Sequence, residues 1–571
     1  MKTIKLESME KIRIFCKNTN RNYEVNPGTT VEDFMKNINY DDGNMRVLAA
    51  YVNNELKELS FEIYLASTIE FLTYADSDGR RTYMRSLNFL LQRAIYDLFP
   101  NRKLILSYNL PNGQYGELRD IEDSTLTYSV SEEDIAQIKA RMQSLVDADT
   151  KIIKTKKSNA EAKRLFLEHN QKDKARLLES IGAFFTSVYY IDGYGDTFYG
   201  PMLPSTGYLD RWDIFKYNAG FCLRSPDKYA PYHLAPQTIQ SKLYDIFQEN
   251  GSWCEVLGAR DIGTINKAIT SGHAKEVINI AEALHSRKYA HIADLIYQKK
   301  DKIKLVLIAG PSSSGKTTTS KRIALQTKVL GLNPIVIAMD DYFVDRELTP
   351  KDENGNYDFE SVYAMNLELL NDHLTKLFAG EEVTLPKFDF AQGKGTLTGD
   401  TIRMHKDDIL IMEGIHALNP ALTAKIDDSL KFKVYASALT SLSIDENNAI
   451  STTDNRKLRR MVRDNNFRGM GAEETLLRWD SVVAGENRNI FPFQENADIM
   501  FNSSLIYELP MLKYFAEPLL RRISPASPAY AESLRLLKFL SYIVPLNPDE
   551  QSAIPPTSIM REFIGGSSFK Y

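Results

Sequence analysis

Residues 310–317 read Gly-Pro-Ser-Ser-Ser-Gly-Lys-Thr, and they stand between an apolar run at 303–309 and a stretch of helical character at 318–330. The apolar run predicts a buried strand, so the order is strand, GxxxxGK[ST] loop and helix, the context in which this loop binds phosphate. Glycine lets the backbone turn successive N–H groups inward, and the helix N-terminus adds partial positive charge. A chance Gly/Ser-rich turn would have to reproduce every fixed position. The segment therefore predicts an α/β unit with a phosphate site.

Each position of this loop has a predicted role in binding a nucleotide. Lys316 is expected to reach the outer phosphates of ATP, and the Thr317 hydroxyl is expected to coordinate Mg²⁺. The loop residues that we predict to bind ATP are Gly310, Ser312, Ser313, Ser314, Gly315, Lys316, Thr317 and Thr318.

The composition is that of a globular protein of several domains in a reducing compartment. The chain has 571 residues, of which 43% are hydrophobic and 25% charged, so about three or four domains are expected. Cys16, Cys222 and Cys254 are too far apart in sequence for a disulfide framework or a metal motif. There is neither a signal-peptide core nor an apolar run of about 18 residues, so we predict a cytoplasmic location and no membrane span.

Changes of pattern divide the chain. Residues 1–75 alternate as a small α/β unit, and residues 76–273 contain amphipathic helical stretches and then a segment rich in Gly, Pro, Tyr and Phe. An amphipathic stretch at 274–300 is predicted to be a helical linker to the phosphate-binding unit at 301–545. Residues 546–571 are predicted to be a tail that frays, because they hold Pro-rich stretches and a terminal Gly-Gly-Ser-Ser.

Further motifs follow the loop. Strand-like runs end at Asp340-Asp341-Tyr342-Phe343 and at Glu413-Gly414, a Pro-Lys-Phe-Asp-Phe segment lies at 386–390, and arginines cluster at 459–468. In order and spacing these motifs resemble the uridine kinase/phosphoribulokinase branch of P-loop kinases. The resemblance implies an α/β fold with a mostly parallel sheet. It also implies phosphoryl transfer from ATP to the hydroxyl of a small-molecule acceptor.

The resemblance also implies roles for individual residues. Asp340 is expected to position the acceptor hydroxyl and take its proton, at the sheet edge where parallel α/β folds bind ligands. Lys316 and Arg463 are predicted to be catalytic with it. Arg460 and Arg468 are predicted to bind the nucleotide, because cationic groups stabilise the charge of phosphoryl transfer. A solvated acidic turn and a basic surface helix are the alternatives.

Glu413 ends an apolar strand, where a charge is costly unless it is paired or bound to a cation. We predict that Glu413 and Thr317 hold Mg²⁺, directly or indirectly. A carboxylate that caps a helix is the alternative for Glu413.

The acceptor site is predicted from positions within the same resemblance. Asp358 matches the family's acidic contact to the sugar, with a turn carboxylate as the alternative. Phe388 lies in the substrate segment in place of a Tyr, and Gly393 stands where uridine kinases have a His that helps to read the base. A nucleoside of uridine or cytidine type, phosphorylated at its 5′-hydroxyl, is the predicted substrate. Another small hydroxyl acceptor is the alternative, because losing polar contacts changes substrate choice.

The front half carries Asp76-Ser77-x-Gly79 and Arg85-Ser86-x-x-Phe89-Leu90-Leu91. Residues 10–75 resemble a TGS domain, a β-grasp module, and residues 76–230 resemble the second N-terminal domain of threonyl-tRNA synthetases, an α+β unit. In the synthetases the second motif reads His-Ser-x-x-His-Leu-Leu. Arg85 and Phe89 cannot hold zinc or act as a His pair would. The resemblance thus predicts a retained scaffold with a lost or altered site.

The front half leaves two other functions open. One is a nucleotide-regulated RNA-binding protein, and the other is hydrolytic editing of aminoacyl-tRNA. The net charge of −5 disfavours nucleic acid as a partner, and the replaced His pair disfavours editing. The resemblance to the kinases also implies self-association into a homo-oligomer.

Overall fold

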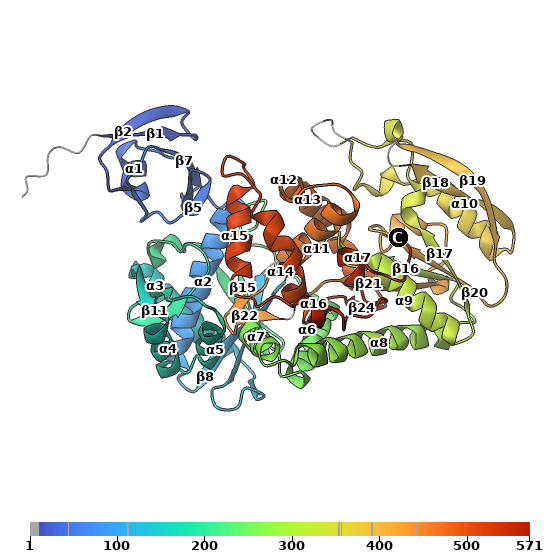
Figure 1. Ribbon diagram of the computed structural model, residues 1–571, viewed down its shortest axis with the longest axis horizontal. Coiled ribbons are helices and arrows are strands. Elements are labelled where there is room, and N and C mark those ends of the chain that lie inside the picture. Colours follow the sequence, from blue (N-terminus) through green and yellow to red (C-terminus); the bar gives the residue numbers. More distant parts are fainter. Residues whose placement is uncertain are drawn as a thin grey trace, which may run out of the picture.

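The computed structural model describes residues 11–43, 45–110, 113–351, 355, 357–389, 392–440 and 442–571. It is a mixed α/β protein in which β-rich units precede a unit with a parallel sheet, as the sequence predicted (Figure 1). The domain boundaries drawn from the sequence stay predictions. No helix in the described part of the chain is long and apolar enough to cross a membrane.

The parallel sheet carries the GxxxxGK[ST] loop. Its strands, in spatial order, are β17 (Asn333–Ala338), β20 (Asp408–Glu413), β16 (Leu305–Ala309), β21 (Lys431–Ser437) and β24 (Ile499–Asn502), and each neighbouring pair is parallel. β16 reads Leu-Val-Leu-Ile-Ala and is buried along its whole length. A strand covered on both faces needs apolar side chains at every position, which explains the continuous apolar run. The predicted parallel sheet is confirmed.

Helices cover both faces of this sheet. On one face Val306 and Ile308 pack against Ile292 of α8 (Ala274–Gln298) and Ile323 of α9 (Lys316–Val329). On the other face Leu305 and Leu307 belong to the same core as α10 (Leu367–Phe378). The hairpin of β18 (Glu382–Asp389) and β19 (Lys394–Arg403) contacts α10 through β18. The carboxyl ends of β16, β17 and β20 thereby meet at one edge, where a ligand site is expected.

The chain then folds into helices beside the sheet. They are α11 (Thr452–Phe467), α12 (Ala472–Leu477), α13 (Trp479–Asn489), α14 (Glu508–Leu520), α15 (Tyr530–Leu540), α16 (Pro548–Gln551) and α17 (Arg561–Ile564). The fraying predicted for the tail is wrong, since Met560 and Phe563 are each 0% exposed. Figure 1 places the C-terminus beside β16 and α17. The tail is ordered because its apolar residues enter the core formed by these helices.

The front half contains four sheets within the described residues, one of them the two-stranded pair of β3 (Thr29–Thr30) and β6 (Glu62–Ile63). The first has the order β2 (Arg21–Val25), β1 (Ile12–Cys16), β7 (Ser67–Leu72), β4 (Ala49–Val52) and β5 (Glu55–Lys57), with α1 (Val31–Asn37) in its core. The second runs β10 (Thr127–Tyr128), β9 (Gly113–Asp120), β15 (Gly220–Arg224) and β14 (Asp213–Tyr217), and β8 (Arg102–Leu110) also pairs with β9. The third is β11 (Ile152–Ser158), β12 (Phe185–Ile191) and β13 (Tyr194–Thr197).

Helices of the front half pack on these sheets and lead to the kinase-like half. They are α2 (Ser77–Leu98), α3 (Glu132–Asp147), α4 (Asn159–Glu168), α5 (Lys172–Ser180), α6 (Ser241–Val256) and α7 (Ile262–Thr270). α2 and α3 share a core with β8, β9 and β15. The predicted helical stretch at 274–300 is α8, which runs along one side of the molecule in Figure 1.

A partly buried ionic network joins the two halves. On α2, Arg81 pairs with Asp78 at 2.6 Å, and it reaches Glu532 of α15 at 3.0 Å. Arg535 of α15 pairs in turn with Asp454 of α11 at 2.6 Å. Opposite charges that leave water need such mutual pairing, because an unpaired buried charge is costly. The front half is therefore tied to α11, the helix that carries the predicted phosphate-binding arginines.

Candidate active site

The loop at 310–318, called the P-loop below, begins directly after β16 and ends inside α9. Gly315 is the N-cap of α9 with φ +78°, a conformation that favours glycine. Gly310 lies so close to β21 that an added Cβ would stand 1.9 Å from the Ala436 carbonyl oxygen. Ser313 has φ +60° without being glycine, which is a strained conformation. The backbone thus holds the shape that the motif predicted.

The polar groups of the P-loop are only partly satisfied. Lys316 Nζ donates to the Pro311 carbonyl oxygen of its own loop at 3.1 Å. Thr317 Oγ1 donates to Glu413 Oε1 at 2.9 Å. The buried hydroxyls of Ser313 and Ser314 have no hydrogen-bond partner among the described residues. Buried polar groups without partners cost stability, so their retention favours a binding role.

Asp340 and Glu413 face Lys316 from the ends of two neighbouring strands. Asp340 follows β17 and retains solvent contact, but the surrounding protein raises its pKa, and Asp341 adds to the rise. Lys316 and Arg468 act in the opposite direction on that carboxyl. Burial also raises the pKa of Glu413, with Asp340 adding and Lys316 opposing. The structure therefore gathers these predicted residues in one site.

The residues present fit a bound Mg²⁺. Thr317 and Glu413 offer hard oxygen ligands side by side, and the pKa of Glu413 is raised, first by burial, so a bound cation would stabilise its charged form. Mg²⁺ is usually held by one or two carboxylates together with substrate phosphates. A cation here would also be close enough to Asp340 to favour its charged form.

Arg460, Arg463 and Arg468 converge on one buried carboxylate. Asp464, which is 0% exposed, receives their nitrogens at 3.1, 3.2 and 3.5 Å respectively. Arg460 NH1 also donates to the Ser312 hydroxyl of the P-loop at 3.0 Å. Arg460 thus contacts the P-loop, whereas Arg468 is 55% exposed, so the basic surface helix named as the alternative does not describe Arg460. The guanidinium groups of these arginines are held where phosphate oxygens could replace part of these contacts.

Two arginines to which the sequence analysis gave no role hold the P-loop by its backbone carbonyl oxygens. Arg456 pairs with Glu486 and donates to the Ser312 carbonyl oxygen at 3.1 Å. Arg459 pairs with Glu508 and donates to the Ser313 carbonyl oxygen at 3.4 Å. Both side chains are at most 2% exposed. All four arginines lie on α11. Only the tertiary contacts show that Arg456 and Arg459 are buried and support the P-loop, whereas Arg460 and Arg463 are more exposed.

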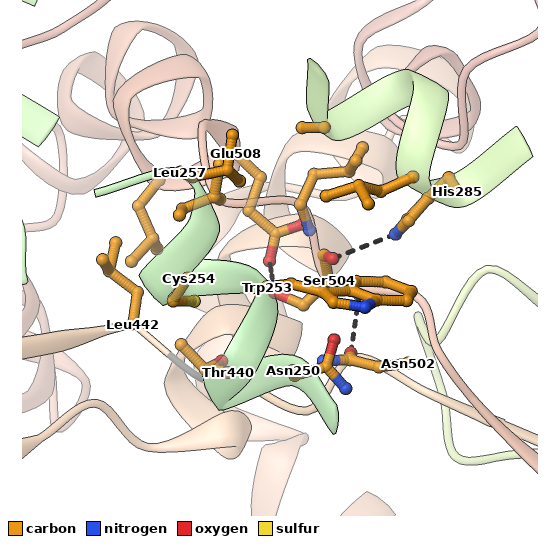
Figure 2. Close-up of a pocket in the computed structure, with 15 residues that line it drawn as sticks. Asn250, Trp253, Cys254, Leu257, His285, Thr440, Leu442, Asn502, Ser504 and Glu508 are labelled. Carbon is orange, nitrogen blue, oxygen red and sulfur yellow. Dashed lines mark hydrogen bonds between the residues drawn. The ribbon is translucent and has the colours of Figure 1, made fainter. Parts of the chain in front are cut away.

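A small cavity adjoins this support (Figure 2). It measures about 40 Å³ and lies between α6, α8 and the loops that follow β21 and β24. Burial lowers the pKa of His285 to about 3, so its neutral ring donates from Nε2 to the Ser504 carbonyl oxygen at 3.1 Å. Ser504 Oγ donates to Glu508 Oε1 at 2.8 Å. Glu508 also pairs with Arg459, which contacts the P-loop. The residues around this cavity therefore support the P-loop from the side of α8.

Of the predicted acceptor residues, Phe388 lies in β18 beside Asp341, and Asp358 lies in the turn at 358–361. Lys387 pairs with Asp341 at 3.0 Å, and the Phe388 ring packs against Phe343 with centroids 5.6 Å apart. Asp358 Oδ1 accepts the Glu360 backbone N–H at 3.2 Å, which is the turn contact named as its alternative. The roles of Asp358 and Phe388 toward an acceptor stay predictions.

Glu360 belongs to the site and was missed from the sequence. Burial raises its pKa to about 7, with Glu486 and Asp358 adding and Arg460 and Lys316 opposing. Its side chain also fills the space beside Gly485, where an added Cβ would stand 2.6 Å from Glu360 Cγ. Only the packing of α13 against the 358–361 turn reveals it, so the sequence held no signal for this residue.

The front-half motif has a different environment. Phe89 is 0% exposed and packs edge-on against Phe198 with centroids 5.1 Å apart. Arg85 Nε donates to the Pro201 carbonyl oxygen at 3.1 Å, and its guanidinium carbon lies 2.4 Å from the place of a Cβ on Gly200. Both side chains are packed in the core, which agrees with the sequence analysis in disfavouring editing chemistry at these two positions.

The comparisons with known proteins also separate a kinase domain from the N-terminal region. The model of the phosphoribulokinase / uridine kinase family matches residues 305–506. Residues 305–506 form a P-loop kinase domain of this family. The uridine kinase of Staphylococcus haemolyticus is 29% identical over 34% of this chain and 86% of its own length. A solved structure of a possible uridine kinase from Bacillus stearothermophilus shows 19% identity and a TM-score of 0.24, covering 35% of this chain and 89% of that one.

The N-terminal region resembles segments of threonine–tRNA ligases. The ligase of Symbiobacterium thermophilum is 32% identical over 29% of this chain. The matched segment spans 25% of the length of that ligase.

Proposed function

We propose that this protein phosphorylates the 5′-hydroxyl of a nucleoside of uridine or cytidine type, using ATP with Mg²⁺. The kinase domain and the similarity to uridine kinases support the proposal. The observation that carries it is the convergence of Lys316, Asp340 and Glu413 at the carboxyl ends of neighbouring parallel strands. A phosphate-binding loop without a candidate base would suit a switch equally well, whereas this set suits transfer.

In the proposed reaction the acceptor oxygen attacks the γ-phosphorus of ATP, the bond to the β–γ bridging oxygen breaks, and ADP leaves. Asp340 receives the hydroxyl proton, and its raised pKa makes it a better proton acceptor than an ordinary aspartate. Lys316, Arg460 and Arg463 stabilise the charge on the phosphoryl oxygens. Mg²⁺, held by Thr317 and Glu413, supplies further neutralisation of the phosphates when bound.

The identity of the acceptor is the more open part of the proposal. Gly393 occupies the place of the base-reading His, and an added Cβ there would stand 2.7 Å from Nε of Arg346. The backbone N–H of Arg346 donates to the Gly393 carbonyl oxygen at 2.8 Å. A position without the base-reading His loosens the choice of acceptor. A hydroxyl acceptor other than a nucleoside therefore stays the second candidate.

The test is ADP release with Mg-ATP against uridine, cytidine, other nucleosides, pantothenate and ribulose 5-phosphate. Lys316→Ala should abolish acceptor-dependent turnover, because the outer phosphates lose their cation. Lys328→Ala, an exposed lysine on the same helix α9, is the matched control and should turn over normally. Turnover with none of the acceptors, despite ATP binding, would contradict the proposal.

A further inference from the structure

The last residues of the chain lie on the P-loop helix. Oε2 of Glu562, in α17, accepts the Thr318 N–H at 3.3 Å and the Thr318 hydroxyl at 2.6 Å. Thr318 is the third residue of α9, and its N–H is one of the donors that a helix leaves free at its N-terminus. The same N–H is among those predicted to bind the nucleotide. A carboxylate of the chain's own tail therefore uses a donor that a phosphate would need.

Other contacts bring more of the tail onto the loop. Ile559 packs on Gly315, with Cδ1 2.3 Å from the place of an added Cβ. The Tyr571 hydroxyl lies 2.9 Å from the Thr318 hydroxyl. NH1 of Arg463 is 4.0 Å from Glu562 Oε1. Glu562 thus faces a backbone N–H, a hydroxyl and a guanidinium, which is a set of donors suited to a phosphate anion.

The tail is fixed on both sides of Glu562. Ser558 Oγ donates to Glu282 of α8 at 2.5 Å, and Arg322 NH1 donates to the Thr557 carbonyl oxygen at 2.9 Å. Beyond it, the Phe563 ring is buried with the Arg459 guanidinium 5.0 Å from its centroid. These contacts fix the segment on both sides of Glu562. The contact of Glu562 with Thr318 is therefore part of the ordered fold and not a chance position of a flexible end.

We propose that residues 555–571 are an autoinhibitory strap, in which Glu562 occupies the position of a nucleotide phosphate on α9. The inference rests on the proposed function, because it takes the P-loop to be the ATP site. A nucleotide and the strap then compete for the Thr318 donors, and each ATP that binds displaces the Glu562 carboxylate. When no nucleotide is bound, the Glu562 carboxylate pairs with the donors that a phosphate would otherwise contact.

The experiment measures Mg-ATP binding by titration calorimetry in the full-length protein and its variants. Glu562→Gln keeps the shape and removes the charge, and it should bind ATP about tenfold more tightly than the native protein. Tyr571→Phe should give a smaller gain, since it loses one neutral contact. Asp549→Asn removes a charge from α16, just before the strap, where Asp549 pairs with Lys275 on the surface, and it should bind as the native protein does.

Hydrogen exchange gives a second readout, and saturating ATP should speed the exchange of amides at 557–566 in the native protein. Equal or weaker ATP binding by Glu562→Gln would overturn the inference, and so would a tail that stays protected under ATP. Absence of ATP binding in both proteins would also overturn it, because removing the carboxylate would then open nothing. Tighter binding without turnover on any acceptor would support the strap and contradict the proposed reaction instead.

Discussion

The front-half motif on α2 and the P-loop both correspond to sites of known proteins, but their polar groups are used differently. Around Arg85 and Phe89 the space is filled by packed side chains, and Arg85 donates to the Pro201 carbonyl oxygen, although Asn88 and Gln92 of the same helix also hold buried polar atoms without a partner among the described residues. Around the P-loop, hydroxyls remain unpaired and carboxyls have raised pKa values. A fold tolerates such costs where a ligand offsets them. The packing of Arg85 and Phe89 and the raised pKa values beside the P-loop favour the interpretation of the α2 region as scaffold and of the P-loop region as the proposed active site.

The largest expected effect tests the P-loop side of this comparison. Asp340→Asn should lower acceptor-dependent turnover by about 10²–10⁴-fold, because the proton acceptor is lost. The free energy of unfolding should stay unchanged or rise, since the surrounding protein raises the pKa of Asp340 and the amide carries no charge. Steady-state ADP release and urea unfolding measure the two quantities.

Asp341→Asn is the matched control for that experiment. Asp341 pairs with Lys387 at 3.0 Å, so its loss should leave most of the turnover in place. Equal losses in the two variants would remove the reason for naming Asp340 as the base.

The second effect tests the scaffold side. Phe89→Ala should lower the free energy of unfolding by about 3–5 kcal/mol, because it leaves a cavity in a fully packed cluster. Urea unfolding measures this, and the KM for ATP should not change in the folded variant. Phe185→Ala, at a phenylalanine that is 57% exposed, should stay within about 0.5 kcal/mol of the native protein. A small cost for Phe89→Ala would mean that this region is more open than its packing shows.

A smaller effect concerns the contact between the two halves. Arg81→Met should cost about 1–3 kcal/mol of unfolding free energy, less than a fully buried pair, because the Arg81 side chain is 31% exposed. Asp78 and Glu532 would lose their shared partner. Calorimetric unfolding should also show a wider gap between the transitions of the two halves. A single unchanged transition would indicate that apolar contacts alone join them.

The smallest effect is a pH dependence within the site. The pKa of Glu360 rises from 4.5 to about 7 in the folded protein, first through burial. Such a carboxyl stabilises the fold fully below its unfolded pKa, and this stability is lost as pH rises through the folded pKa. Glu360→Gln should therefore match the native protein near pH 4 and exceed its melting temperature increasingly up to pH 7. Identical melting curves at pH 8 would rule out this environment for Glu360, and the exposed Glu473→Gln is the control.

Much of the site could be predicted from sequence because its chemistry is local. The P-loop follows the buried strand β16, Glu413 ends the buried strand β20, and Asp340 follows the edge strand β17. Parallel strands bring their carboxyl ends to one edge. Arg456, Arg459 and Glu360 could not be assigned, since their roles depend on which side of α11 and α13 faces the loop. The ordered tail was mispredicted from Gly and Pro content, although Ile559, Met560 and Phe563 are apolar residues that a core can bury.

The sequence by itself determined the strand–loop–helix unit, the parallel sheet and the residue types that can handle phosphate, because periodicity and glycine placement act within a few residues. Only the tertiary structure decided which arginines are support and which remain accessible, that the α2 motif is filled, and that Glu562 reaches Thr318 from 244 residues away. Burial and charge pairing depend on contacts between residues that are far apart in the sequence. A carboxylate therefore pairs with the donors that the folded chain places beside it.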